Sequence, residues 1–225
     1  MEKAEASVKS KSSKALPTAA SQDRRSQIEE VATRAFCKMG YSGASMRDIA
    51  REMKTTQAAV YYHFSSKEDI LHSIISRFTE QLLALLRERF ESTTDPVESL
   101  RRALLAHILL QETHSFETRL VIEEKRNLGQ VSRDRIVLRE KEVYALYRQR
   151  VLALVASGRA RAFEPAVVTF ALLGIVNYFL HWFRPGGPLS LRLAAEQSIS
   201  LMLDGLLLPE KGSARANAKR SARVA

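Results

Sequence analysis

Residues 45–71 read SMRDIAREMKTTQAAVYYHFSSKEDIL, and this stretch contains the starts of three helices. Ser45 is a good capping residue, and Asp48 follows it at the spacing of a capping box. Thr56 can cap a second short helix over 57–63, and the run SSKED then opens a long helix. Two short helices joined by a turn of about three residues match the spacing of a helix-turn-helix.

A first helix over 22–39 is expected to precede this stretch, and Gly40 is expected to end it. Apolar residues recur along this helix at helical spacing, so they are expected to pack with apolar residues of the two short helices. Together these residues predict the core of a three-helix head: Ile28, Val31, Ala32, Ala35, Phe36, Ile49, Ala50, Val60 and Phe64.

The stretch resembles the DNA-binding head of the TetR family of bacterial regulators, whose usual pattern is a capped T-x-R-x-I-A followed by YYHF-x-S-K-E-x-L. The resemblance covers about 60 residues directly. It implies that Gln57, Ala58 and Ala59 face the bases, with Gln57 able to pair bidentately with adenine. It also implies a second set that contacts the groove or the phosphates and so positions the protein: Ser45, Arg47, Lys54, Thr56, Tyr61, Tyr62, His63 and Lys67.

Structural roles remain open for members of this second set. Tyr61 either donates to a phosphate or covers the edge of the head core. His63 either faces a phosphate or forms a hydrogen bond that orders the turn. Lys67 lies in the first turn of its helix, where the helix dipole makes a cation mildly unfavourable, and this favours a function for it.

The formal net charge of +10 at pH 7 favours a polyanionic partner, but the charge is not in the head. Residues 22–95 hold eleven basic and eleven acidic side chains, whereas residues 96–203 hold fifteen basic and ten acidic ones. The assignment of the head therefore rests on its motif. The excess cations of the body need a separate explanation, and an anionic effector supplies one.

The composition favours a cytoplasmic protein without disulfides, structural metal ions or cofactors. The chain has one cysteine, Cys37, so no intramolecular disulfide framework forms, and no Cys/His cluster predicts a metal site. No signal peptide is expected, and the longest apolar stretch, 166–180, is too short to span a membrane. We expect four parts: a disordered basic tail, the head, an effector-binding and dimerisation body, and a second disordered basic tail, at 1–21, 22–82, 83–208 and 209–225.

Beyond the head, nearly every segment has helical periodicity, and no strand pattern flanked by hairpin signals occurs. The run TTDPVESL is a strong helix start, with Asp95 as the cap and Pro96 at the first helical position. The fold class is therefore all-α, with about nine helices. The helices of the body are expected over 96–112, 115–127, 132–157, 165–183 and 190–207.

The helix expected over 165–183 is apolar on almost all sides, so it is expected to pack against a partner. The resemblance implies that the last two helices of each subunit form a four-helix dimer interface, and a two-fold dimer matches half-sites about one turn apart. The expected interface residues are Tyr178, Phe183, Ile199, Met202 and Leu206.

The run HWFRPGGPLS, residues 181–190, resembles the W-[YF]-R-P-G-G-P-L run of TetR-family members that respond to acyl-CoA thioesters. A purely structural turn is the alternative. Steroid-type members carry arginines one and two turns before the tryptophan, which this chain lacks, so a steroid-derived thioester is disfavoured. The expected ligand-binding residues are Arg126, Arg133, Asn177, His181 and Trp182.

The sequence thus predicts a homodimeric DNA-binding regulator, a repressor released from its operator by an acyl-CoA-like effector. A ligand-independent DNA-binding or architectural protein, whose body only dimerises, is the alternative. No enzyme activity is expected, because His107, Glu112 and His114 form only a loose set without a nucleophile-base pair.

Overall fold

The computed structural model describes residues 19–184 and 186–209, and this part of the chain folds into nine α-helices with no strand beyond one isolated β-bridge between Ala160 and Leu207. The predicted all-α class is confirmed. The rest of the two predicted tails lies outside the described residues. Within the described residues, no helix is both long enough and apolar enough to cross a membrane.

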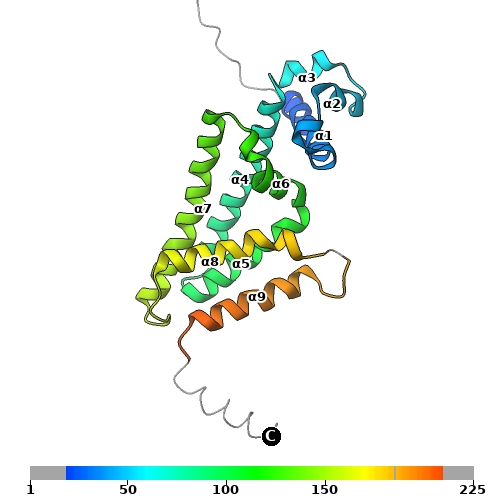
Figure 1. Cartoon of the computed structure of the whole chain (residues 1–225). Coiled ribbons are helices and arrows are strands. Elements are labelled where there is room, and N and C mark those ends of the chain that lie inside the picture. The colour runs from blue at the N-terminus through cyan, green and yellow to red at the C-terminus, as the bar shows by residue number, and fades with distance from the viewer. Residues whose placement is uncertain (1–18, 185, 210–225) are drawn as a thin grey trace, which may run out of the picture.

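Three helices form the head, and they match the sequence prediction closely (Figure 1). Their bounds are Ala19–Gly43 for α1, Met46–Glu52 for α2 and Gln57–His63 for α3. α1 begins three residues before the predicted start, because the alanines and polar residues there favour a helix. Gly40 breaks α1 as predicted: its φ of 73° lies in the left-handed region, and a short helical turn follows it.

Helix α4, Lys67–Glu91, joins the head to the body (Figure 1). Its first apolar residues, from Ile70 to Ile75, are buried in the head core with Val60 and Phe64. Those from Leu82 onward belong to the body core. One continuous helix therefore has its two halves in two different cores.

The body is built from the remaining helices, some of which lie alongside α4 while others lie beyond its lower end in Figure 1. Asp95 caps the first of them, as predicted, by accepting a hydrogen bond from the Glu98 backbone at 2.8 Å. The helices are α5 (Pro96–Thr113), α6 (Ser115–Arg119), α7 (Gln130–Ala156), α8 (Pro165–Trp182) and α9 (Leu191–Leu206).

The prediction of one helix over 115–127 is wrong in its detail. The chain forms α6, then a π-helical turn over Leu120–Glu124, then a 3₁₀ turn over Lys125–Asn127. Leu120 and Leu128 are buried in the head core, together with Ile136 of α7. This irregular segment and the first part of α7 therefore pack directly on the head.

Candidate nucleic-acid interface and ligand pocket

Helix α3 is anchored by its apolar side and exposes the residues expected to read bases. Val60 is fully buried in the head core, and Phe64 follows it there. Gln57 and Ala58 are exposed, whereas Ala59 is half-buried. The Thr56 hydroxyl accepts a hydrogen bond from the Ala59 backbone at 3.1 Å, which caps the first turn of α3 as predicted.

Helix α2 braces α3 and presents Arg47 at its start. Ile49 and Ala50 are buried, and Arg47 is exposed at the start of the helix. The capping box is complete, because the Asp48 backbone donates to the Ser45 hydroxyl at 3.2 Å and the Ser45 backbone donates to the Asp48 carboxylate at 3.1 Å. The Ser45 hydroxyl also donates to the Asp48 carboxylate at 2.5 Å, and this hydrogen bond is the main reason why the pKa of Asp48 lies below its ordinary value.

The turn between α2 and α3 contains an exposed residue in the left-handed region, Lys54, with a φ of 51°. A residue other than glycine is uncommon there. The Thr55 backbone donates to the Ala50 carbonyl at 3.0 Å and so closes the turn. Lys54 is therefore exposed in a closed turn that directly precedes α3.

Lys67 has structural contacts that the sequence did not reveal. Its ammonium group donates to the carbonyl oxygens of Tyr41, at 2.6 Å, and of Ala44, at 2.9 Å, and lies 4.3 Å from the centroid of the Tyr41 ring. Lys67 thus ties the start of α4 to the segment between α1 and α2. Its contact with phosphate stays a prediction.

The end of α3 is held by Arg25 of α1. The Arg25 guanidinium donates to the His63 carbonyl and lies 3.9 Å from the centroid of the Phe64 ring. Burial, then the charges of Arg25 and Arg24, lower the pKa of the His63 imidazole, so its neutral form is favoured. Tyr61 is half-exposed and Tyr62 is 84% exposed, so both hydroxyl groups are accessible.

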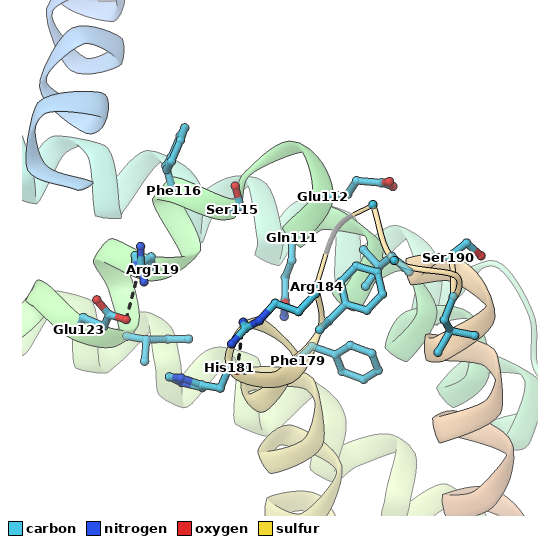
Figure 2. Close-up of a pocket in the computed structure, with 16 residues that line it drawn as sticks. Gln111, Glu112, Ser115, Phe116, Arg119, Glu123, Phe179, His181, Arg184 and Ser190 are labelled. Carbon is cyan, nitrogen blue, oxygen red and sulfur yellow. Dashed lines mark hydrogen bonds and ion pairs between the residues drawn. The ribbon is translucent and has the colours of Figure 1, made fainter. Parts of the chain in front are cut away.

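A pocket of about 480 Å³ lies in the body between the ends of α5 and α6, the π-helical turn, and the connection from α8 to α9 (Figure 2). Its size is within the range of small-molecule sites. Apolar side chains line one side: Phe179, Phe183, Leu189 and Leu191. The polar side chains of the lining are those of Gln111, Glu112, Ser115, Arg119, Glu123, His181, Arg184 and Ser190, and the apolar side chains of Phe116 and Ile122 also line the pocket.

Of the five residues expected to bind a ligand, only His181 lines this pocket. Arg126 is exposed outside it, and Asn177 and Trp182 are exposed on α8. Arg133 donates to the Leu128 carbonyl at 2.8 Å near the head. The structure therefore places these four outside the pocket. Asn177 and Trp182 lie on another face of α8, whereas Arg126 and Arg133 lie on segments that contribute no residue to the pocket.

The structure adds Arg184, Arg119 and Gln111 to the pocket. Arg184 belongs to the HWFRPGGPLS run, so its place in that motif could have identified it as a candidate ligand-binding residue. Arg119 was one of many body cations, and nothing in its local sequence separates it from the others. Gln111 could not be found from the sequence, since its place depends on how α5 packs against α8.

Two of the expected interface residues are buried in the subunit's own core. Ile199 is 2% exposed and Leu206 is 6% exposed, so the structure removes both from the expected dimer surface. Tyr178 is exposed, and Met202 and Phe183 are half-buried. The apolar side chains that α8 and α9 expose are Val167, Phe170, Ile175, Tyr178, Trp182, Leu193 and Leu201.

Both parts of the chain match models of known families. Residues 28–74 match the model described as bacterial regulatory proteins of the tetR family. Residues 93–206 match the model described as the C-terminal domain of tetracyclin repressor-like proteins.

Individual relatives agree with these matches. The transcriptional repressor KstR2 of Mycobacterium tuberculosis strain H37Rv is 25% identical over 185 residues, which cover 81% of this chain and 92% of the relative. The solved structure of KstR2 of Mycobacterium tuberculosis is similar with a TM-score of 0.77, at 25% identity, over 83% of this chain and 96% of that chain.

Two further solved structures are similar at higher identity. AibR in complex with isovaleryl coenzyme A and operator DNA is similar with a TM-score of 0.74, at 29% identity, over 79% of this chain and 97% of that chain. The regulator PfmR from Thermus thermophilus is similar with a TM-score of 0.75, also at 29% identity and over 79% and 97% of the two chains.

Proposed function

The chain belongs to the TetR family of bacterial regulatory proteins, and from this premise we propose that it is a homodimeric repressor that leaves its operator DNA when an acyl-CoA-like effector binds the body. A regulator that reads bacterial DNA acts in the cytoplasm, as the sequence predicts. The proposal assigns DNA binding to residues 22–82, effector binding and dimerisation to residues 83–208, and no enzyme activity to either part.

The observation that carries the DNA-binding part is the way in which α3 is presented. Its buried side fixes it on α1 and α2, and its first turn exposes Gln57 and Ala58. A side-chain amide can pair bidentately with adenine, and a small neighbour lets the helix approach the bases closely. Arg47, Lys54 and Tyr62 are exposed around it and can contact phosphates.

The dimer is supported by the apolar side chains that α8 and α9 expose. Several large exposed apolar side chains are more typical of an association surface than of the surface of a monomer. Two copies related by a two-fold axis would cover both faces, and their two α3 helices would then read two half-sites about one helical turn apart.

The effector is supported by the pocket and by one similar structure. The pocket has an apolar side and two arginines, which suits an amphipathic anion. AibR, whose structure contains isovaleryl coenzyme A and operator DNA, is 29% identical to this chain. Together they favour an acyl-CoA-like ligand over a neutral one.

The DNA-binding part is tested by titrating the purified protein onto the DNA upstream of its own gene at several salt concentrations. We expect specific binding that weakens steeply with salt, and competition by the same sequence but not by random DNA. Equal affinity for both DNAs would contradict the proposal.

The effector part is tested by adding a panel of acyl-CoAs to the protein-operator complex. We expect at least one of them to release the DNA, and the same compound to bind the free protein in calorimetry. If no compound of a broad amphipathic panel binds, the alternative of a ligand-independent DNA-binding protein is favoured instead.

A further inference from the structure

The pocket contains an amide group of which one half has no partner. The Gln111 side chain is nearly buried, and its amide nitrogen donates to the Val176 carbonyl at 2.8 Å, which fixes the orientation of the amide. The amide oxygen accepts no hydrogen bond from any residue that the structure describes. This oxygen is not among the buried side-chain atoms that lack a partner, so it is open to the pocket, where a donor group of a ligand can bind it.

The pocket also contains a guanidinium group without an acidic partner. Among the described residues, Arg184 forms no ion pair, and its one hydrogen bond runs at 3.5 Å to the His181 carbonyl. Figure 2 shows its side chain extending into the space between Gln111 and His181. Such a group is free to bind an anion.

The second arginine of the pocket is different, because it is already neutralised. Arg119 pairs with Glu123 at 3.3 Å, and both side chains line the pocket. Glu112, the other acid of the lining, points away from Arg184 in Figure 2. Arg184 is thus the cation of this pocket that offers an uncompensated charge.

We propose that the pocket recognises three features of one ligand: an apolar chain on Phe179 and Phe183, an N–H or O–H donor bound by the Gln111 amide oxygen, and an anionic group bound by Arg184. This rests on the proposed function and names the chemistry of its effector. An acyl thioester of a phosphorylated pantetheine has all three features, since the pantetheine arm carries amide N–H groups. A free fatty acid has the chain and an anion but no donor beside it.

Ligand binding can be measured without DNA because the chain has a single tryptophan, Trp182. Its ring centroid lies 4.9 Å from that of Phe179 and 6.2 Å from that of Phe183, and both rings line the pocket. The tryptophan fluorescence of the full-length protein therefore serves as the readout for titrations.

Four compounds separate the three features: octanoyl-CoA, S-octanoyl-pantetheine, octanoate and methyl octanoate. We expect octanoyl-CoA to bind most tightly, S-octanoyl-pantetheine and octanoate each about tenfold more weakly, and methyl octanoate most weakly, because each missing charged or polar contact costs affinity. Octanoate binding as tightly as octanoyl-CoA would show that the carboxylate alone is the anion and would overturn the need for a donor.

Two variants assign the contacts to residues. Arg184→Gln should weaken octanoyl-CoA about tenfold and leave S-octanoyl-pantetheine unchanged, whereas Arg184→Lys should keep most of the affinity. Gln111→Leu should weaken both thioesters and leave octanoate unchanged. Arg192→Gln is the matched control, because Arg192 is exposed on α9, outside the pocket, and pairs with Glu196.

The outcomes separate this inference from the proposed function. If the protein binds its operator but none of the four compounds changes the fluorescence, or if Arg184→Gln weakens all of them equally, the ligand assignment is wrong and the DNA-binding function stands. If the compounds and variants behave as expected but the operator is not bound specifically, the pocket assignment stands and the repressor function falls.

Discussion

At the scale of single residues, the exposed and the anchored side chains of the head have separable effects on DNA binding and on stability. Gln57 is exposed on α3, and its side chain forms no hydrogen bond with another described residue. Lys67 is half-buried and bonds two carbonyl groups. The two substitutions below therefore test whether a reading residue and an anchoring residue can be told apart.

Gln57→Ala should weaken operator binding by about 1–3 kcal/mol and relax the preference at one base position, without changing stability. A competition assay against operators changed at single positions, together with urea unfolding, measures both. Gln149→Ala, at an exposed position of α7, is the control and should change neither. A Gln57→Ala protein that keeps the full base preference would show that another residue reads the DNA.

Lys67→Met should lower the free energy of unfolding by about 1–3 kcal/mol, because it removes hydrogen bonds from a charged donor to Tyr41 and Ala44. It should also weaken all DNA sequences to a similar extent, since the segment between α1 and α2 loses its anchor. If operator affinity falls while urea unfolding is unchanged, Lys67 acts through phosphate contacts alone.

A buried histidine should make the stability of the body depend on pH. His107 is buried beside the Tyr147 hydroxyl, at 3.1 Å from its Nδ1, and burial lowers the pKa of His107 from 6.5 to about 4. Between these values the unfolded chain binds the proton and the folded chain does not, so stability is complete above pH 6.5 and falls as the pH drops toward 4.

The expected loss is up to about 3 kcal/mol, measured as the difference in urea unfolding between about pH 7 and about pH 4.5. The His107→Gln variant keeps a side chain that can bond the Tyr147 hydroxyl but does not titrate. Its unfolding should lose that component of the pH dependence. An identical pH profile in both proteins would show that other groups cause it.

At the scale of elements, the first half of α4 bonds both to the head and to the body. A nearly buried carboxylate, Glu29 of α1, pairs with Arg77 at 2.6 Å and accepts a hydrogen bond from Ser73 at 2.6 Å. At the start of α4, the Glu68 carboxylate accepts a hydrogen bond from the Gly129 backbone at 2.8 Å. Gly129 precedes α7 and has no side chain, so Glu68 caps α7 from another helix.

Glu68→Ala should therefore destabilise the start of α7 by about 0.5–2 kcal/mol, the usual effect of a lost N-terminal cap. Hydrogen exchange of the amides at 130–133 should become faster, while those in the middle of α7 stay protected. Glu88→Ala is the control on the same helix, because Glu88 is exposed and pairs only with its neighbour Arg89 among the described residues. Unchanged exchange at 130–133 would exclude the capping role.

At the scale of the whole molecule, α8 and α9 each have a buried face and an exposed face. Substitutions on the exposed face are expected to weaken dimerisation, whereas substitutions on the buried face are expected to destabilise the subunit. Leu201 is 77% exposed on α9, and Ile199, two positions away, is 2% exposed. The sequence prediction assigned Ile199, but not Leu201, to the dimer interface. Their burial separates them.

Leu201→Arg should weaken dimerisation and operator binding without lowering the melting temperature of the diluted protein, because it puts a charge into the expected interface. Ile199→Ala should destabilise the subunit by about 2–5 kcal/mol, since it leaves a cavity in the body core. Analytical ultracentrifugation and thermal melts separate the two effects. A Leu201→Arg protein that remains dimeric would place the interface elsewhere.

The sequence by itself determined the all-α class, the helix-turn-helix and nearly every helix boundary. Caps such as Ser45, Thr56 and Asp95, and the break at Gly40, act within one turn of the chain, so their geometry is encoded locally. The π-helical turn at Leu120–Glu124 escaped prediction because Leu120 must reach the head core while its neighbours line the pocket.

Only the tertiary structure decided which side chains face the pocket, the core and the expected partner. Gln111, Arg119 and Arg184 come from three separate segments and meet only because those segments pack together. Ile199 and Leu206 have the same apolar character as exposed Leu201, and only the phase of α9 on the body buries them. Local sequence encodes where a helix begins and ends, whereas the direction of each side chain depends on long-range packing.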